Sequence, residues 1–175
     1  MNYSIKRLFK QNYFLPTSPN QKKLTYKWTE HPLKPYSAYS TALRFQNNPN
    51  LLTDRLVLLD IDVTKEKPIP QQLLDWIIKH PTYTESSFSG LGGLHLIYTL
   101  DTSTHDILRN ITGRFTLPDL GELFINSGYV IVTAKEIQTQ QLSPGQRVAN
   151  CIDLTALTAL TALFNIKKEN DFSIK

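Results

Sequence analysis

The central feature of the sequence is the segment Leu56-Val57-Leu58-Leu59-Asp60-Ile61-Asp62, an apolar run with two aspartates two positions apart. Such a run predicts a buried β-strand. Successive side chains of a strand point to opposite faces, so Asp60 and Asp62 share one face while Ile61 points into the core. Neighbouring carboxylates repel each other, and a divalent cation such as Mg²⁺ or Mn²⁺ relieves the repulsion by taking their oxygens as ligands. The alternative is that both aspartates follow the strand and meet only water.

The bulk composition is that of a folded globular protein. A length of 175 residues predicts a single domain over 1–175 with a sizeable core, and 41% hydrophobic and 19% charged residues agree with it. No apolar run approaches the roughly 20 residues that cross a bilayer, and no signal peptide is evident. The single cysteine, Cys151, excludes an internal disulfide and a multi-cysteine zinc site. We therefore expect a cytoplasmic protein without membrane contact.

Charge is distributed unevenly along the chain. Residues 1–50 contain eight Lys or Arg and one acid, whereas residues 51–175 contain eleven Lys or Arg and fourteen acids. Many aromatic residues also lie in the basic part, and cations interleaved with rings suit nucleic acid, because phosphates attract the charge and bases stack on rings. The candidate DNA contacts are Lys22, Lys23, Lys27, Trp28 and Arg44. The alternative is that the lysines belong to a solvated loop and the rings to the core.

The hydrophobic pattern predicts both helices and strands. Helices are expected at 4–12, at 37–46 with Ser37 as N-cap, after Pro68 and Pro70, at 103–110 and at 151–166. Strands are expected at 56–62, 82–87 and 94–100, and as a hairpin of 120–125 and 129–133 that turns at 126–128. This mixture predicts an α+β or mixed α/β fold, in which a mixed or antiparallel sheet carries the acidic residues on one face, with flanking helices.

A glycine-rich segment, Ser89-Gly90-Leu91-Gly92-Gly93, leads directly into the predicted strand that carries His95. Glycines allow backbone N–H groups to approach a phosphate closely, and Ser89 and His95 can add side-chain donors. The segment is not a P-loop, because no Gly-Lys-Ser/Thr follows it. The alternative is an ordinary hairpin turn beside a core histidine. Glu122, on a later predicted strand, adds a third acid to these candidate site residues. The alternative is that Glu122 is a solvated strand residue.

The order of these motifs resembles the primase-polymerase branch of the archaeo-eukaryotic primase superfamily, found in replication proteins of phages, plasmids and other mobile elements. The resemblance covers residues 25–140 and rests on Leu-Asp-Ile-Asp, on the segment from Tyr83 through the glycines to His95, and on Gly-Glu-Leu-Phe-Ile with the strand after it. It implies that Asp60, Asp62 and Glu122 are catalytic metal ligands. The resemblance also implies that the incoming triphosphate is held by Ser89, Gly90, Gly92, Gly93 and His95.

The resemblance implies a DNA primase or DNA polymerase within a replication protein of a mobile element. Two Mg²⁺ or Mn²⁺ ions would activate a primer 3′-hydroxyl or an initiating nucleotide on a single-stranded DNA template, with a dNTP or NTP as substrate. Residues 51–140 would then be the catalytic core, and residues 1–50 a basic part that carries the template. A helicase or another replication protein is a candidate partner.

Two other functions fit the same sequence. The first is a non-catalytic module with the primase fold that binds single-stranded DNA or an origin. Leu91 favours it, because family members often carry Lys or Arg in this loop, whereas three retained carboxylates speak against it. The second is a metal-dependent nuclease, which also uses clustered acids. A nuclease cleaves DNA with Mg²⁺ and no nucleotide, whereas a polymerase needs nucleotide and lengthens its primer.

Overall fold

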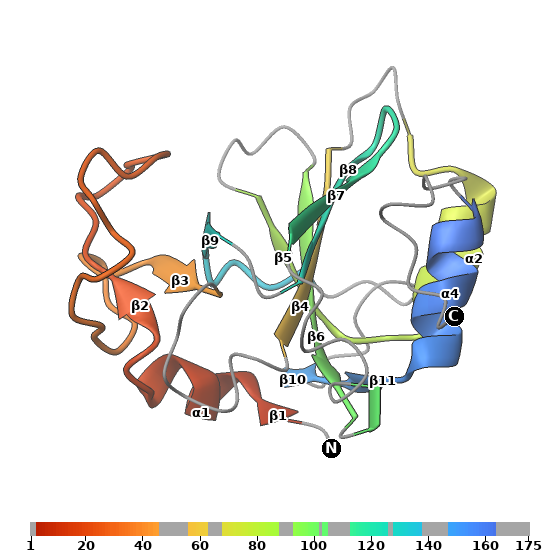
Figure 1. The fold of residues 1–175 in the computed structure, drawn as a ribbon, viewed down its shortest axis with the longest axis horizontal. Coiled ribbons are helices and arrows are strands. Elements are labelled where there is room, and N and C mark those ends of the chain that lie inside the picture. Colours follow the sequence, from red (N-terminus) through yellow and green to blue (C-terminus); the bar gives the residue numbers. More distant parts are fainter. Residues whose placement is uncertain are drawn as a thin grey trace.

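The computed structural model describes residues 3–45, 56–62, 68–87, 93–101, 103–104, 113–125, 128–137 and 147–163 (Figure 1). Its helices are α1 (Ile5–Lys10), α2 (Gln71–Lys79) and α4 (Leu154–Leu163). Its strands are β1 (Tyr3–Ser4), β2 (Phe14–Leu15), β3 (Ala42–Arg44), β4 (Leu56–Ile61), β5 (Tyr83–Ser86), β6 (Leu94–Leu100), β7 (Gly113–Leu117), β8 (Gly121–Ile125), β9 (Tyr129–Ile131), β10 (Val148–Ala149) and β11 (Cys151–Ile152). The predicted α+β fold is confirmed.

A six-stranded sheet organises the molecule, with the order β11-β6-β4-β8-β7 and with β5 paired to β6 beside β11. Only the β11–β6 pairing is parallel among these strands, so the predicted mixed sheet is confirmed. The predicted strand of the two aspartates is β4, which lies between β6 and β8 at the centre of the sheet. A smaller antiparallel sheet has the order β2-β3-β9, and β1 pairs with β10.

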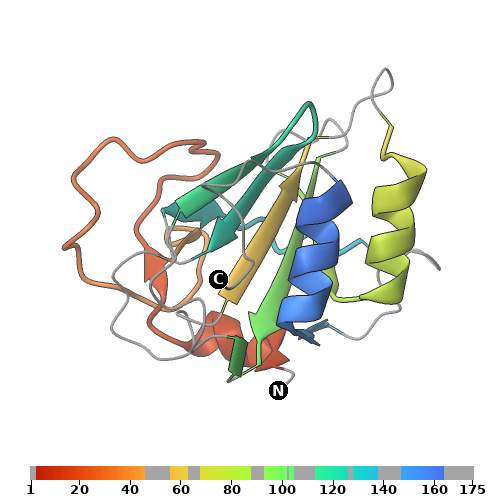
Figure 2. The same cartoon turned by 45° about the vertical axis from the view of Figure 1, so that its right-hand side comes forward.

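The helices α2 and α4 cover one face of the six-stranded sheet and lie side by side (Figure 2). Alternation along β4 sends Val57, Leu59 and Ile61 to this face, where they join the larger apolar core. The indole Nε1 of Trp76 donates to the carbonyl of Ala156 at 3.0 Å and ties the two helices together. Helix α4 lies within the predicted segment 151–166.

The opposite face of the sheet packs against the N-terminal part of the chain (Figure 1). Leu56 and Leu58 of β4 lie there in a second apolar cluster that includes Ile5 and Leu8 of α1 and Phe14 of β2. Residues far apart in the sequence therefore form a second layer over this face. No described helix has the length and apolar character to cross a bilayer.

The predicted helix at 37–46 is wrong. The chain turns at Ser37 and Ser40, whose backbones bond each other, and then forms strand β3 between β2 and β9. The local pattern of small and apolar residues also suits a helix. The chain forms a strand here instead of a helix because β2 and β9 satisfy the backbone hydrogen bonds of β3 on both sides.

The predicted hairpin of 120–125 and 129–133 is also wrong. Strand β8 has β4 on one side and β7 on the other, while β9 pairs with β3 in the smaller sheet. The hairpin that the structure contains joins β7 to β8, with Asp119 at a φ of 62° in its turn. Of the predicted helix at 103–110, Ser103 and Thr104 are described and helical, and residues 105–110 lie outside the described ones.

Candidate active site

Strand register brings the predicted site residues into one row across the sheet. Asp60 of β4 lies directly opposite His95 of β6 on one side and Glu122 of β8 on the other. The row continues to Glu85 of β5, opposite His95, and to Thr116 of β7, opposite Glu122. Side chains directly opposite each other project to the same face, roughly 5 Å apart at their Cβ atoms. The row lies on the face turned away from α2 and α4.

Asp62 lies outside this cross-strand row, one position beyond the end of β4. It is exposed and follows the last residue of the strand, and its N–H donates to the carbonyl of Leu120 at 2.6 Å. Gly121 lies opposite Ile61 at a φ of 149°, and a Cβ at this position would clash with the backbone of Asp60. Only glycine therefore allows β8 to approach the end of β4 this closely.

The acidic residues open into a pocket of about 410 Å³ between the two sheets. One part of its lining carries Asp60, Asp62, Glu122 and His95, with Ser87 beside them. The other part consists of β9 with Phe124 and two lysines, Lys22 and Lys23. Acids and cations thus share one pocket, an arrangement that suits a ligand with both metal-binding and anionic groups.

The three carboxylates fit a hard divalent cation by their chemistry and by their shared pocket. In the described part of the chain, however, no three His, Cys, Asp or Glu side chains form a ready metal-binding group. Like-charged carboxylates repel one another when no cation lies between them. The Mg²⁺ or Mn²⁺ site at Asp60, Asp62 and Glu122 stays a prediction.

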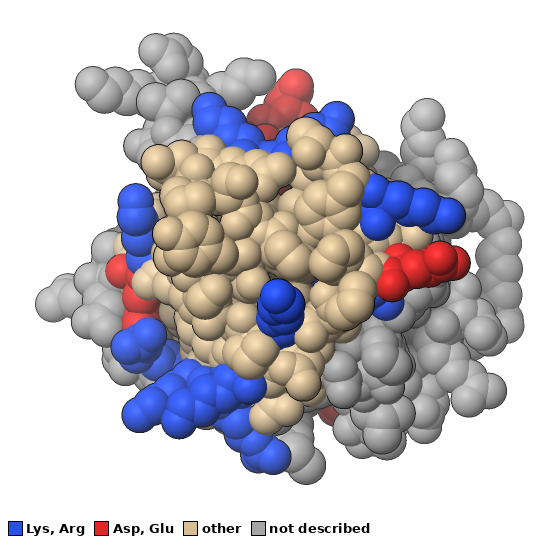
Figure 3. All heavy atoms as spheres, turned by 90° about the vertical axis from the view of Figure 1, so that its left-hand side faces the viewer, with Lys and Arg blue, Asp and Glu red and all other residues tan. Residues whose placement is uncertain are grey.

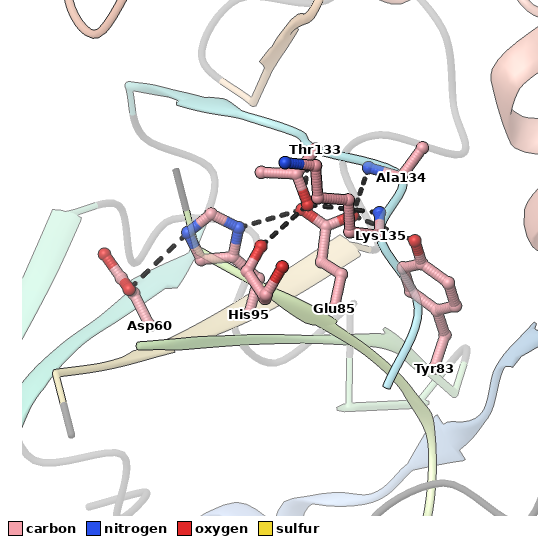
Figure 4. A network of polar contacts seen from close by, with 8 residues as sticks. Asp60, Tyr83, Glu85, His95, Thr133, Ala134 and Lys135 are labelled. Atoms are coloured by element: carbon pink, nitrogen blue, oxygen red, sulfur yellow. Dashed lines mark hydrogen bonds and ion pairs between the residues drawn. The ribbon is translucent and has the colours of Figure 1, made fainter. Parts of the chain in front are cut away.

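His95 bridges two carboxylates and is only 5% exposed (Figure 4). Its Nδ1 lies 3.0 Å from Oε2 of Glu85, and its Nε2 lies 3.6 Å from Oδ1 of Asp60. Burial lowers the pKa of His95, but the hydrogen bond and charge of Glu85, together with the charges of Asp60 and Asp62, outweigh burial and raise it. His95 is thus buried, as the core alternative expects, but it also lines the acidic pocket.

Glu85 is a site residue that the sequence reasoning missed. Its side chain is fully buried, and its carboxylate accepts hydrogen bonds from the Tyr83 hydroxyl at 2.9 Å and the Thr133 N–H at 2.8 Å. The Ala134 N–H adds a longer one at 3.3 Å (Figure 4). Because the carboxylate occupies Nδ1 of His95, the Nε2 atom is directed toward Asp60 and the pocket. Alternation in 82–87 places Glu85 on one face with Tyr83, but nothing local indicates its pairing with His95.

The glycine-rich segment lies mostly outside the described residues. Ser89, Gly90 and Gly92 are not described, so their predicted contact with a triphosphate stays a prediction. Gly93, the last residue of the segment, is described, and its carbonyl accepts from the N–H of Ser87 at 2.8 Å. Ser87, two residues before the segment, also lines the acidic pocket.

The lysines of the pocket are held by their own loop. The side chain of Gln21 accepts from the N–H of Ser18 at 2.8 Å and donates to the carbonyl of Lys23 at 2.9 Å. The N–H of Leu24 donates to the Tyr129 hydroxyl at 3.0 Å, which ties this loop to β9. These bonds hold the backbone that carries Lys22 and Lys23 beside the pocket, and both residues are exposed.

The other predicted DNA contacts differ in position. Lys27 is exposed but is not among the described residues that line the acidic pocket. Trp28 is half-buried, with its ring edge-on to Tyr129 at 5.1 Å between centroids. Arg44 is only 5% exposed and donates to the carbonyl of His31 at 3.4 Å, so the structure does not support its expected role as a DNA contact. Pairing of β3 with both neighbours carries this side chain into the interior.

Comparison with known proteins does not assign the chain to a family. No protein-family model matches it, and a search of curated proteins found no match. The resemblance to primase-polymerases therefore rests on the residues of the site alone.

Proposed function

We propose that this chain is a nucleotidyltransferase of the primase-polymerase type, which adds nucleotides to a primer 3′-hydroxyl or an initiating nucleotide on a single-stranded DNA template. One observation carries the proposal. Asp60, Glu122 and His95 occupy one cross-strand row and, with Asp62, open into the pocket that Lys22 also lines. Metal ligands, a hydrogen-bond donor and a cation are the groups that phosphoryl transfer from a nucleoside triphosphate requires.

The acids and the cations of the pocket have different tasks in this proposal. Asp60, Asp62 and Glu122 would hold the divalent ions, which when bound polarise phosphoryl oxygens and make the attacking hydroxyl more acidic. Lys22 and Lys23 would attract the triphosphate and balance the charge of the departing pyrophosphate. The 3′-oxygen bonds to the α-phosphorus, the bond to pyrophosphate breaks, and the hydroxyl proton leaves to solvent.

His95 and Glu85 would position the nucleotide. A proton on Nε2 of His95 can donate to a phosphate oxygen, and the Glu85 carboxylate holds the ring by its Nδ1. Glu85 itself is surrounded by donors from the Tyr83 hydroxyl and the loop at Thr133 and Ala134. This arrangement keeps the ring orientation before the substrate arrives, so little reorganisation is required at the reaction step.

A primer-extension and de novo priming assay tests the proposal. Labelled primer on a single-stranded template is incubated with dNTPs or NTPs and with Mg²⁺ or Mn²⁺. Lengthened products that require both nucleotide and metal, and that disappear in Asp60→Asn, are expected. A Lys79→Gln variant, altered at an exposed end of α2 on the other face, is the control with unchanged activity. Shortened DNA without nucleotide would instead identify a nuclease.

A non-catalytic DNA-binding module is the second candidate. It is favoured by one observation, the lack of a ready three-residue metal group among the described residues. In that case the protein binds single-stranded DNA, shows no incorporation with either metal, and its melting temperature does not respond to Mn²⁺. The wider assignments, a replication protein of a mobile element and a helicase partner, are part of the proposal and depend on the same assay.

A further inference from the structure

Two more pockets continue from the acidic pocket along the N-terminal part of the chain. The second pocket, of about 450 Å³, shares Lys22 and Ile131 with the acidic pocket. The third pocket, of about 630 Å³, lies between α1 and β10 and shares Tyr36 with the second. Because each pocket shares lining residues with the next, the three lie next to one another in this order, and we refer to the series as the groove.

The charge of the groove changes sign along its length. Beyond the acidic pocket, the second and third pockets add the cations Lys135, Lys6, Lys10 and Arg147. None of the described residues that line the second and third pockets is an Asp or a Glu. Arg147 is paired with Glu136 at 2.9 Å, so Lys6, Lys10 and Lys135 are the described cations of these two pockets that remain for a ligand. Figure 3 shows the face formed by the N-terminal part, with Lys and Arg around it and gathered at its lower edge.

Aromatic rings lie in the third pocket beside these cations. Phe9 and Tyr36 are stacked at 4.6 Å between centroids with an interplanar angle of 20°, and both are only half-buried. Phe14 packs edge-on against both rings, and the N–H of Tyr36 donates to the carbonyl of Phe9 at 2.9 Å. The pair is therefore a rigid apolar surface that borders solvent.

We infer that a single strand of nucleic acid lies in this groove, with its phosphates on the lysines and a base against the Phe9–Tyr36 pair. A lysine-lined groove with a fixed aromatic surface is the arrangement by which proteins bind single strands without sequence preference. Hydroxyl and amide side chains of the second pocket, among them Ser18, Asn20 and Thr41, can bond bases or phosphates of any sequence. The inference rests on the proposed function in one respect, because it makes the bound strand the template that enters the acidic pocket.

Binding of labelled oligo-dT, measured by fluorescence anisotropy without metal or nucleotide, tests the groove. One oligonucleotide of about four and one of about twelve nucleotides separate contact at one pocket from contact along the groove. The double variant Lys6→Gln/Lys10→Gln alters the third pocket at two exposed positions of α1. We expect it to bind the longer oligonucleotide about tenfold more weakly, with a slope of log K against log salt lower by about 1.4. Its affinity for the shorter one should fall by a smaller factor, because that oligonucleotide can lie in the second pocket instead.

Controls decide between the groove and a general charge effect. Lys79→Gln removes one exposed cation from the other face of the sheet and is expected to leave both affinities unchanged. If Lys6→Gln/Lys10→Gln and Lys79→Gln behave alike, or if duplex DNA of equal length competes as well as the single strand, the inference is overturned. Equal melting temperatures of the variants exclude unfolding as the cause. Failure of primer extension with normal groove binding would overturn the proposed function and leave the groove standing.

Discussion

Two adjacent rows of the six-stranded sheet, one residue apart in every strand, face opposite sides of the molecule. The row toward α2 and α4 is almost wholly apolar and contains Leu96, Leu59, Leu123 and Phe115. The row toward the N-terminal part contains Glu85, His95, Asp60, Glu122 and Thr116. One row is thus apolar, and the other carries the charged residues of the candidate site.

The contrast shows how a small sheet carries a charged site without losing its core. On the site face the row of Tyr83, Ile97, Leu58 and Phe124 is apolar and packs in the second cluster. The acids of this face thus lie at the end of the sheet where β4 finishes and a pocket begins, whereas the apolar row ends on β7 at a cation, Arg114, opposite Phe124. Glu85 is the fully buried acid of the row that contains Asp60, and the five donor groups around its carboxylate offset its desolvation.

The largest expected effect is a loss of activity when an acid is removed from the row that contains Asp60 and Glu122, here called the site row. Asp60→Ala or Glu122→Ala removes a carboxylate that the proposed reaction needs for its metal ions, so nucleotide incorporation should fall by about 10²- to 10³-fold or more. Primer extension measures the loss. Because removal of one carboxylate relieves repulsion among the others, the melting temperature without metal should change little. A steep fall in that temperature would show that these acids are structural.

A substitution in the apolar row toward α2 and α4 should lower stability and leave activity intact. Leu59→Ala leaves a cavity in the core under α2 and α4, and the free energy of unfolding should drop by about 2–5 kcal/mol. Urea unfolding followed by circular dichroism measures it. Activity per folded molecule should be retained at low temperature. If Leu59→Ala instead abolishes incorporation while stability stays normal, the separation of the two rows is incorrect.

A smaller effect is expected at His95. Loss of one hydrogen bond to a charged phosphate is worth about 1.5–3 kcal/mol, so His95→Ala should lower kcat/KM by about tenfold to a hundredfold. The metal concentration that gives half-maximal rate should not change. Steady-state kinetics at several Mn²⁺ concentrations separates the two quantities. A changed metal requirement would make His95 a ligand, and an unfolded variant would support the core alternative.

The smallest effect on activity is expected at Glu85, the fully buried acid of the site row. Glu85→Gln keeps the shape of the side chain but replaces one acceptor by a donor that faces other donors, at a cost of about 1–3 kcal/mol of stability. Incorporation should decrease less than in His95→Ala, because the imidazole is still present but less well oriented. Imidazole ¹⁵N chemical shifts of His95 report the change directly. Unchanged shifts would show that Glu85 does not hold the ring.

Several elements follow from local pattern alone. The segment around Asp60 forms a strand because its residues are apolar and bulky, and α2 begins after Pro70 with its apolar stripe turned inward. Ser4 and Asp153 cap α1 and α4 through side-chain oxygens that accept from Arg7 and Ala156. Each of these depends on residues within a few positions of one another.

Other elements depend on distant partners, and there the sequence-based predictions were wrong. Strand β3 was predicted as a helix, because its partners β2 and β9 lie about 30 and 90 residues away and no local signal identifies them. The same pairing buries Arg44 and takes β9 away from β8. Glu85 escaped notice for the same reason, since its importance depends on the register of β5 with β6.

Local sequence was sufficient to place Asp60 and Asp62 at the end of a buried strand and to give that strand one apolar face, because side-chain alternation is a property of the chain itself. Tertiary structure was required to set Glu122, His95 and Glu85 beside Asp60 and to bring the lysines of the N-terminal loop over the same pocket. The physical reason is that cross-strand register and the packing of one sheet on another depend on the whole core, which no single segment contains.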